Sequence, residues 1–217
     1  MFENRIDAGQ SLGARLKEFA AEEDVLVLAL PRGGVPVGFE VARALNAPLD
    51  VFLVRKLGVP GHEELAMGAL ASGGVRLLDA KTVRVLNVSP EQVEEVIRRE
   101  ALELDRRERL YRGEREALDV LGRTVILVDD GMATGLTMRA AITALRHKRV
   151  QRIIVAVPVA ARDTCEEMES AADAIVCLYT PLEFFAVGQW YWNFSQTTDD
   201  EVRDLLQRAQ HGQDRVA

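Results

Sequence analysis

The chain has 217 residues, of which 48% are hydrophobic and 28% are charged, and its formal net charge is −7. These values are typical of a globular protein with one sizeable core, and the negative charge argues against a general nucleic-acid-binding protein, whose surface is basic. No apolar run approaches the roughly 20 residues of a membrane helix, and the N-terminal sequence MFENRIDAG has no basic region followed by an apolar one. We therefore expect a cytoplasmic protein that binds neither membranes nor nucleic acid.

The first part of the chain predicts a helix, a buried strand and a second helix. Asp7, with Gln10 three residues later, has the spacing of a helix cap. The apolar face expected for this helix consists of Leu12, Leu16, Phe19 and Ala20. Residues 25–30 are all apolar, as in a strand covered on both faces, and a helix is expected over about 36–45.

Between this strand and this helix lies the tetrapeptide Pro31-Arg32-Gly33-Gly34. Adjacent glycines let the backbone approach a ligand closely, and the guanidinium group of Arg32 is suited to phosphate oxygens. A tight turn between strand and helix, with no ligand, is the alternative that the tetrapeptide leaves open.

A second short strand is predicted over residues 50–54, and it ends in Arg55 and Lys56. These basic residues are either ligands for an anion or solvated charges at a strand end. The glycine-rich stretch 57–74 predicts a mobile loop that leads into a hairpin. The hairpin strands are expected near 65–70 and 75–78.

A long helix is predicted over about 90–111. Ser89 is its expected cap, Pro90 lies in its first turn, and Gln92 occupies the capping-box position. Arginines near its end alternate with acidic residues, which favours a solvated, salt-bridged face over a nucleic-acid-binding surface. The arginines are Arg106, Arg107, Arg109 and Arg112, and the acidic residues are Glu103, Asp105, Glu108, Glu114 and Glu116.

The most informative stretch is VILVDDGMATGLT, residues 125–137. It predicts a buried strand that ends in Asp129 and Asp130, then a loop of small and hydroxyl residues, then a helix with apolar residues at 3.6 spacing. Loop amides at a helix N-terminus favour an anion such as phosphate, and Thr134 and Thr137 add hydroxyl groups. Carboxylates instead accept hydrogen bonds from hydroxyl groups. A sugar phosphate with vicinal hydroxyls satisfies both halves, whereas a solvated strand end is the alternative.

Two further buried strands are expected at 152–157 and 174–178, with a helix at 161–170 between them. Five strands joined by helices predict a mainly parallel sheet with both faces covered. Because ligands bind at the carboxyl ends of such strands, the loops at 31–34 and 129–137 are expected to share one ligand.

Other sites are not expected from the remaining motifs. Cys165 and Cys177 fall in a predicted helix and a predicted strand and, without a secretion signal, are expected to be reduced and buried. The three histidines, His62, His147 and His211, lack the spacing of zinc ligands. The sequence also contains neither Gly-x-x-x-x-Gly-Lys-Ser/Thr nor Gly-x-Gly-x-x-Gly, which argues against two other classes of nucleotide-binding protein.

The last informative stretch, residues 181–202, is rich in aromatic side chains. Six of the chain's twelve aromatic residues fall within eleven positions around Gly188. Aromatic faces can stack on a nucleobase, and Phe185, Trp190 and Tyr191 are the candidates. A hydrophobic clamp that fastens the C-terminal tail to the core or to a partner subunit is the alternative.

Residues 125–137 resemble the phosphoribosyl diphosphate (PRPP) signature of the type I phosphoribosyltransferases, a hydrophobic strand followed by Asp-Asp, small residues, Thr-Gly and Thr. The resemblance extends to residues 31–34 and, in topology, to most of the core. It implies a single α/β domain over 1–217, built on a doubly wound, mainly parallel five-stranded sheet. A helical and hairpin insertion is expected at about 60–118, and an aromatic hood segment at about 181–217.

The resemblance also assigns residues to parts of PRPP. The catalytic residues would be Asp129 and Asp130, which take the ribose hydroxyls, with Arg32 and Lys56. The 5-phosphate would bind Ala133, Thr134, Gly135, Leu136 and Thr137. The pyrophosphate would bind Arg32, Gly33, Gly34, Arg55 and Lys56. The acceptor base would bind Phe185, Trp190 and Tyr191.

The implied reaction is transfer of a 5-phosphoribosyl group from PRPP to a nitrogenous acceptor such as a nucleobase, with release of pyrophosphate. Mg²⁺ would act through PRPP, with Asp129 and Asp130 as further ligands, and a homodimer is expected. Some purine-salvage members carry an acidic residue where this chain has Ala133, so the acceptor stays open. A PRPP-sensing or nucleotide-sensing regulator without transferase activity is the alternative, although the presence of Arg32 and Lys56 favours an enzyme.

Overall fold

The computed structural model describes residues 1–22 and 24–213. Its main feature is a five-stranded sheet in which every neighbouring pair is parallel, with the order β2-β1-β6-β7-β8. The strands are β1 (Val25–Ala29), β2 (Leu49–Val51), β6 (Thr124–Val128), β7 (Arg152–Val159) and β8 (Ala174–Tyr179). The predicted parallel five-stranded fold is therefore confirmed, and the strand order reverses between β1 and β6, where ligands of such sheets bind.

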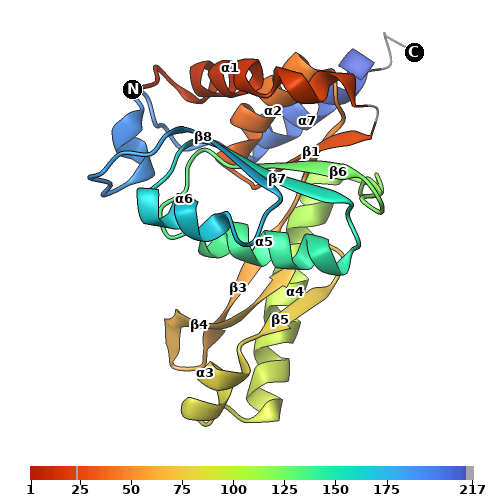
Figure 1. Cartoon of the computed structure of the whole chain (residues 1–217). Coiled ribbons are helices and arrows are strands. Elements are labelled where there is room, and N and C mark those ends of the chain that lie inside the picture. Colours follow the sequence, from red (N-terminus) through yellow and green to blue (C-terminus); the bar gives the residue numbers. More distant parts are fainter. Residues whose placement is uncertain (23, 214–217) are drawn as a thin grey trace.

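Helices cover both faces of this sheet (Figure 1). One face carries α1 (Arg5–Arg15), α2 (Gly34–Leu45) and α7 (Asp199–Gln213), and the other carries α5 (Leu136–His147) and α6 (Arg162–Met168). Alternate residues of β1 divide between the faces, because side chains of a strand point in opposite directions. Val27 packs with the first set of helices and Leu28 with the second.

Between β2 and β6 the chain forms an insertion that extends away from the parallel sheet (Figure 1). It contains the antiparallel strands β3 (Val54–Val59), β4 (His62–Ala71) and β5 (Val75–Leu78) and the helices α3 (Ala80–Val85) and α4 (Pro90–Arg112). The capping box predicted for Ser89 and Gln92 is confirmed. The insertion begins at β3, a few residues before the predicted bound.

The hairpin strands predicted near 65–70 and 75–78 are confirmed as parts of β4 and β5. The mobile loop predicted before them is wrong, because that stretch belongs mainly to β3 and to the start of β4, which pair as a hairpin. Two of its glycines, Gly58 and Gly68, serve close strand packing. A Cβ atom on Gly58 would lie 2.9 Å from the Cα of Glu63, and one on Gly68 would overlap the carbonyl oxygen of Leu77. The predicted strand at 50–54 is likewise divided, since β2 ends at Val51 and β3 begins at Val54.

Two helices begin earlier than predicted. The cap of α1 is Asn4, whose side-chain oxygen accepts hydrogen bonds from the amides of Ile6 and Asp7 at 2.9 and 3.1 Å. Asp7 therefore lies inside the first turn, where its carboxylate accepts from the amide of Glu3. Helix α2 begins at Gly34, the second glycine of the pair, and Gly33 is its N-cap residue.

The base of α4 is fixed to the sheet by a buried ion pair. The Nε atom of Arg112 lies 3.0 Å from both carboxylate oxygens of Asp50 on β2, and its guanidinium group also donates to the carbonyl of Val51 at 2.6 Å. Both side chains are less than 10% exposed. The contact holds the insertion to the edge of the parallel sheet.

Cys165 and Cys177 are half-buried free thiols whose sulfur atoms lie 2.8 Å apart. Burial, with the neighbouring thiol, raises the pKa of Cys177, which favours the protonated form. Over the described range, no helix is long and apolar enough to cross a membrane.

Candidate active site

The acidic corner, Asp129 and Asp130, follows β6 at the point where the strand order reverses. The backbone amide of Asp130 donates to Oδ1 of Asp129 at 2.8 Å. Burial raises the pKa of Asp129 well above its ordinary value, and the adjacent charge of Asp130 raises it further. Burial also raises the pKa of Asp130, although the guanidinium group of Arg5 opposes that rise.

The tetrapeptide loop after β1 packs directly against this corner. A Cβ atom on Gly33 would overlap Oδ2 of Asp130, and one on Gly34 would lie 2.8 Å from the carbonyl oxygen of Val128. No side chain larger than hydrogen fits between the two loops at these positions. The peptide bond between Pro31 and Arg32 is cis. The structure thus brings the two predicted ligand-binding loops into contact, as their places at strand ends suggested.

Arg5, from the first turn of α1, completes the corner, and sequence analysis missed it. Its Nε and its terminal nitrogen each lie 2.8 Å from Oδ2 of Asp130, and its other terminal nitrogen donates to the carbonyl of Ser195 at 2.7 Å. Its guanidinium carbon lies 4.0 Å from the ring centre of Phe194. The side chains of Arg5 and Asp130 are only 11% and 14% exposed. In the sequence Arg5 resembles any solvated residue at a helix start, so no signal marks it.

The predicted 5-phosphate loop leads into α5. Gly135 has φ of +67°, a conformation that glycine adopts without strain, and helix α5 begins at the next residue. Thr134, Leu136 and Thr137 are exposed at this helix N-terminus, whereas Gly135 is buried. The carbonyl of Ala133 accepts from the hydroxyl of Thr164 on α6 at 2.6 Å, which fixes the loop from behind.

The structure separates the two basic residues predicted at the end of the second strand. Both lie inside β3, where consecutive side chains point to opposite sides. Arg55 lines a recess of about 30 Å³ together with Pro31, Thr137 and Arg107 of α4. Lys56 does not line this recess, and its amino group lies 3.1 Å from the carbonyl oxygen of Glu64 on β4.

Arg32 points toward the start of α7 and the end of α4. One terminal nitrogen lies 3.9 Å from Oδ1 of Asp199, and the same oxygen accepts from the hydroxyl of Tyr111 at 2.6 Å. Burial and this hydrogen bond raise the pKa of Tyr111 to about 12. Helices α4 and α7 therefore meet beside the tetrapeptide loop, a contact that neither segment's sequence indicates.

The hood segment is fastened to the acidic corner. The hydroxyl of Tyr191 donates to the carbonyl of Asp130 at 2.5 Å, and its ring lies between Phe2 and Phe194 at centroid distances of 5.5 and 5.0 Å. The ring is only 5% exposed, so Tyr191 serves the clamp instead of offering a free face to a base. This corrects its predicted role.

The other two predicted acceptor-binding residues, Trp190 and Phe185, differ in how far their rings are exposed. Trp190 is half-buried against Phe2, and its indole nitrogen has no hydrogen-bond partner within the described chain. Phe185 is 79% exposed. Of the three predicted aromatic residues, Phe185 has the ring that is freest to stack.

The corner fits a magnesium ion held mainly by a substrate. Within residues 1–22 and 24–213, no group of three or more His, Cys, Asp or Glu side chains could hold a metal. Asp129 and Asp130 supply oxygen donors, the type that Mg²⁺ prefers, and Mg²⁺ commonly takes one or two carboxylates together with substrate phosphates.

Comparisons with known proteins identify the family of this chain. A family model described as phosphoribosyl transferase domain matches residues 4–200. The Mycobacterium tuberculosis protein named "Putative phosphoribosyl transferase Rv0571c" is 46% identical over 209 residues, which are 96% of this chain and 47% of that protein. The chain thus spans about half the length of this relative. The crystal structure of TT1426 from Thermus thermophilus is 39% identical, with a TM-score of 0.85, and the match covers 96% of this chain and 98% of that one. The chain therefore belongs to the phosphoribosyl transferase domain family.

Proposed function

We propose that this chain transfers a 5-phosphoribosyl group from PRPP to a nitrogenous acceptor, for which a nucleobase is the simplest candidate, and releases pyrophosphate. The observation that supports this most is the contact between Gly33 and Asp130. It places the loop suited to pyrophosphate within reach of the carboxylates suited to ribose hydroxyls. One molecule of PRPP carries both groups.

The acidic corner would bind the ribose. Asp129 and Asp130 accept hydrogen bonds from the two vicinal hydroxyls, and the charge of Arg5 favours the ionised form of Asp130. The exposed amides and hydroxyls at the start of α5, from Ala133 to Thr137, would bind the 5-phosphate. The sugar is then held at both ends.

Catalysis would come from electrostatics and positioning. As the bond at C1 breaks, positive charge develops on the ribose and negative charge on pyrophosphate. A charge pair at about 4 Å in an effective dielectric near 20 interacts by about 4 kcal/mol, on the scale of a thousandfold in rate. The carboxylates face the sugar, whereas Arg32 and Arg55 are the cations for the leaving group, and Lys56 lies outside the recess. Bound Mg²⁺ would neutralise further charge on the pyrophosphate.

The acceptor would bind beside the hood, with Phe185 offering an exposed face and Trp190 part of the wall. Ala133 leaves the choice among nitrogenous bases open. A cytoplasmic location and a homodimer remain parts of the proposal, and light scattering of the purified chain tests the dimer.

The deciding experiment is calorimetric titration with PRPP, with and without Mg²⁺. The wild type is expected to bind PRPP more tightly with Mg²⁺, and the double variant Asp129→Asn/Asp130→Asn is expected to lose that binding while it stays folded. A folded wild type that binds no PRPP overturns the proposal. Given binding, release of pyrophosphate on addition of candidate bases identifies the acceptor.

A second candidate function is a PRPP-binding or nucleotide-binding regulator without transferase activity. It is favoured by the internal pairing of the basic residues, since Arg32 pairs with Asp199, Arg55 with Glu100 and Lys56 with Glu64. An assay of pyrophosphate release distinguishes the two functions. A regulator binds PRPP but releases no pyrophosphate with any nitrogenous base.

A further inference from the structure

We infer that Arg107 of α4 is a further pyrophosphate-binding residue, and that Glu103 holds its guanidinium group until the ligand replaces it. This inference rests on the proposed function, because the pyrophosphate is part of PRPP. It gives the charged face of α4, which the sequence predicted to be solvated and salt-bridged, a direct part in the site.

The position of Arg107 carries the inference. Arg107 lines the same recess as Pro31, Thr137 and Arg55, and the other residues that line it, Leu30, Phe52, Leu53 and Val54, are apolar. Four separate segments of the chain therefore meet there. These are the tetrapeptide loop, the start of α5, β3 and α4. A recess of about 30 Å³ has room for one or two waters. It can therefore receive oxygens of a single phosphate group while the rest of the ligand lies outside.

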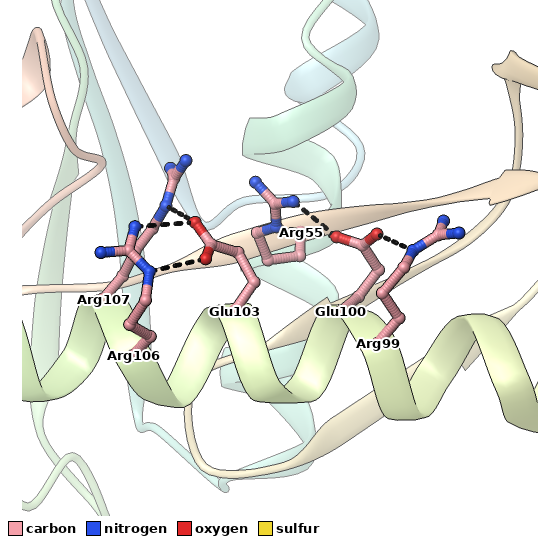
Figure 2. Close-up of polar contacts among 6 residues, drawn as sticks. All are labelled: Arg55, Arg99, Glu100, Glu103, Arg106 and Arg107. Carbon is pink, nitrogen blue, oxygen red and sulfur yellow. Dashed lines mark hydrogen bonds and ion pairs between the residues drawn. The ribbon is translucent and has the colours of Figure 1, made fainter.

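The charges around the recess favour an anion. Figure 2 shows Glu100 and Glu103 on the same side of α4, each shared by two arginines. Glu103 pairs with Arg106 and Arg107, and Glu100 pairs with Arg55 and Arg99. Among these six residues, four guanidinium groups and two carboxylates give a net charge of +2, on a chain whose formal net charge is −7, and two of the guanidinium groups, those of Arg55 and Arg107, belong to residues that line the recess. This local excess suits a multiply charged ligand such as pyrophosphate.

The pairing around Glu103 makes an exchange of partners possible. Its Oε1 lies 2.7 Å from Nε of Arg107, whereas its Oε2 lies 2.7 Å from Nε of Arg106. When Arg107 turns to a phosphate, Glu103 keeps Arg106, so no carboxylate is left without a partner. The two arginines lower the pKa of Glu103 to about 2, so the carboxylate stays ionised throughout the neutral range. The exchange is therefore a competition between two anions for one guanidinium group.

A neighbouring contact holds this part of α4 in place. Tyr111 lies one turn after Arg107, and its hydroxyl donates to Asp199, the residue that also pairs with Arg32. Arg107 is therefore carried by a helix that is tied to the start of α7 and lies beside the tetrapeptide loop. Its side chain is 36% exposed, which leaves the guanidinium group accessible to a ligand.

The test compares Arg107→Gln with Arg106→Gln. Both variants remove one positive charge and one partner of Glu103, but only Arg107 lines the recess. Titration with magnesium pyrophosphate is expected to show affinity that is roughly 10- to 100-fold weaker in Arg107→Gln, the size of a lost charged hydrogen bond. Arg106→Gln is expected to stay within about threefold of the wild type, because exposed charges are screened.

Two further measurements separate binding from a general defect. Ribose 5-phosphate lacks the pyrophosphate, so its affinity is expected to be the same in Arg107→Gln and in the wild type. Glu103→Gln is expected to bind pyrophosphate more tightly than the wild type, because it releases Arg107. A structural defect would weaken both ligands in Arg107→Gln.

The outcomes also distinguish this inference from the proposed function. If the wild type binds PRPP through Asp129 and Asp130 but Arg107→Gln and Arg106→Gln bind pyrophosphate equally well, the inference is overturned and the proposed function stands. If the folded wild type binds neither PRPP nor pyrophosphate, both are overturned.

Discussion

The acidic corner and α4 both lie beside the tetrapeptide loop, but they are held by different kinds of contact. At the corner, Gly33 and Gly34 bring backbone against Asp130 and Val128, with no space for a methyl group. On α4, the contacts join the ends of long side chains such as Arg106 and Glu103 (Figure 2). Close-packed backbone has one arrangement, whereas paired side chains can exchange partners. The corner is thus suited to fix a reacting sugar, and α4 to adjust to a charged ligand.

Exposure strengthens this contrast. The Arg5–Asp130 pair is 11% and 14% exposed, whereas the Arg106–Glu103 pair is 59% and 29% exposed. Exposed ion pairs contribute about 0–1 kcal/mol to stability, and buried ones cost several kcal/mol when one partner is removed. The effects of variants in the two regions should therefore differ in the property that changes as well as in magnitude.

The largest effect is expected where α4 is anchored to the edge of the parallel sheet. Arg112→Gln leaves the buried carboxylate of Asp50 without its partner, so the free energy of unfolding should fall by about 3–5 kcal/mol. Urea unfolding measures this loss. Arg98→Gln, which breaks the exposed pair with Glu95 on the same helix, should stay within about 0.5 kcal/mol. Equal midpoints for the two variants would remove the distinction between the base and the outer face of α4.

The second largest effect is expected from a methyl group placed between the two loops, which should weaken the binding of PRPP. In Gly33→Ala the added carbon meets Oδ2 of Asp130, so the corner must shift, and a shift of about 1 Å costs roughly 100-fold in a positioned reaction. PRPP titration and turnover measure the effect. Gly74→Ala is the control, because its added carbon has nothing within 4 Å although its φ is +77°. It should lose about 1 kcal/mol of stability and keep its affinity for PRPP.

Asp129→Asn should raise the stability of the folded state and lower the turnover. Burial raises the pKa of Asp129, so ionisation of this carboxylate destabilises the folded state, and wild-type stability is lost as pH rises through the raised pKa. The variant should therefore be more stable than the wild type at pH 8, and the difference should vanish near pH 4. Its turnover should fall sharply. Urea unfolding at both pH values, with the same difference at each, would contradict this account.

The smallest effect is expected in the hood. Tyr191→Phe keeps the buried ring but leaves the carbonyl of Asp130 without its hydrogen bond, which should cost about 1 kcal/mol. Thermal unfolding measures it. Tyr179→Phe removes a hydroxyl from a ring that is 48% exposed and should change stability by less than about 0.5 kcal/mol. Indistinguishable melting temperatures would mean that the hood does not depend on this bond.

Much of the fold could be predicted from local patterns, and the errors have physical causes. Residues 125–128 and 152–157 form buried parallel strands as predicted, because a strand covered on both faces must be apolar throughout. Glycines, however, serve both mobile loops and tightly packed strands, so Gly58 and Gly68 were misleading. The sequence also could not show that Arg55, and not Lys56, lines the recess, because this depends on how β3 packs against the rest of the chain.

The sequence by itself determined the parts of this protein that lie close together in the chain: the parallel strands, the capping box of α4, and the run from Asp129 to Thr137 that ends at a helix N-terminus. Each depends on residues within one or two turns or one strand, where spacing alone fixes geometry. Only the tertiary structure decided which distant residues complete the site. Arg5 reaches Asp130 across 125 positions, and Arg107 meets Pro31 and Thr137 from a separate helix. Such contacts depend on how helices and strands pack against one another. The sequence pattern around a charged residue does not show whether its side chain faces solvent or a ligand.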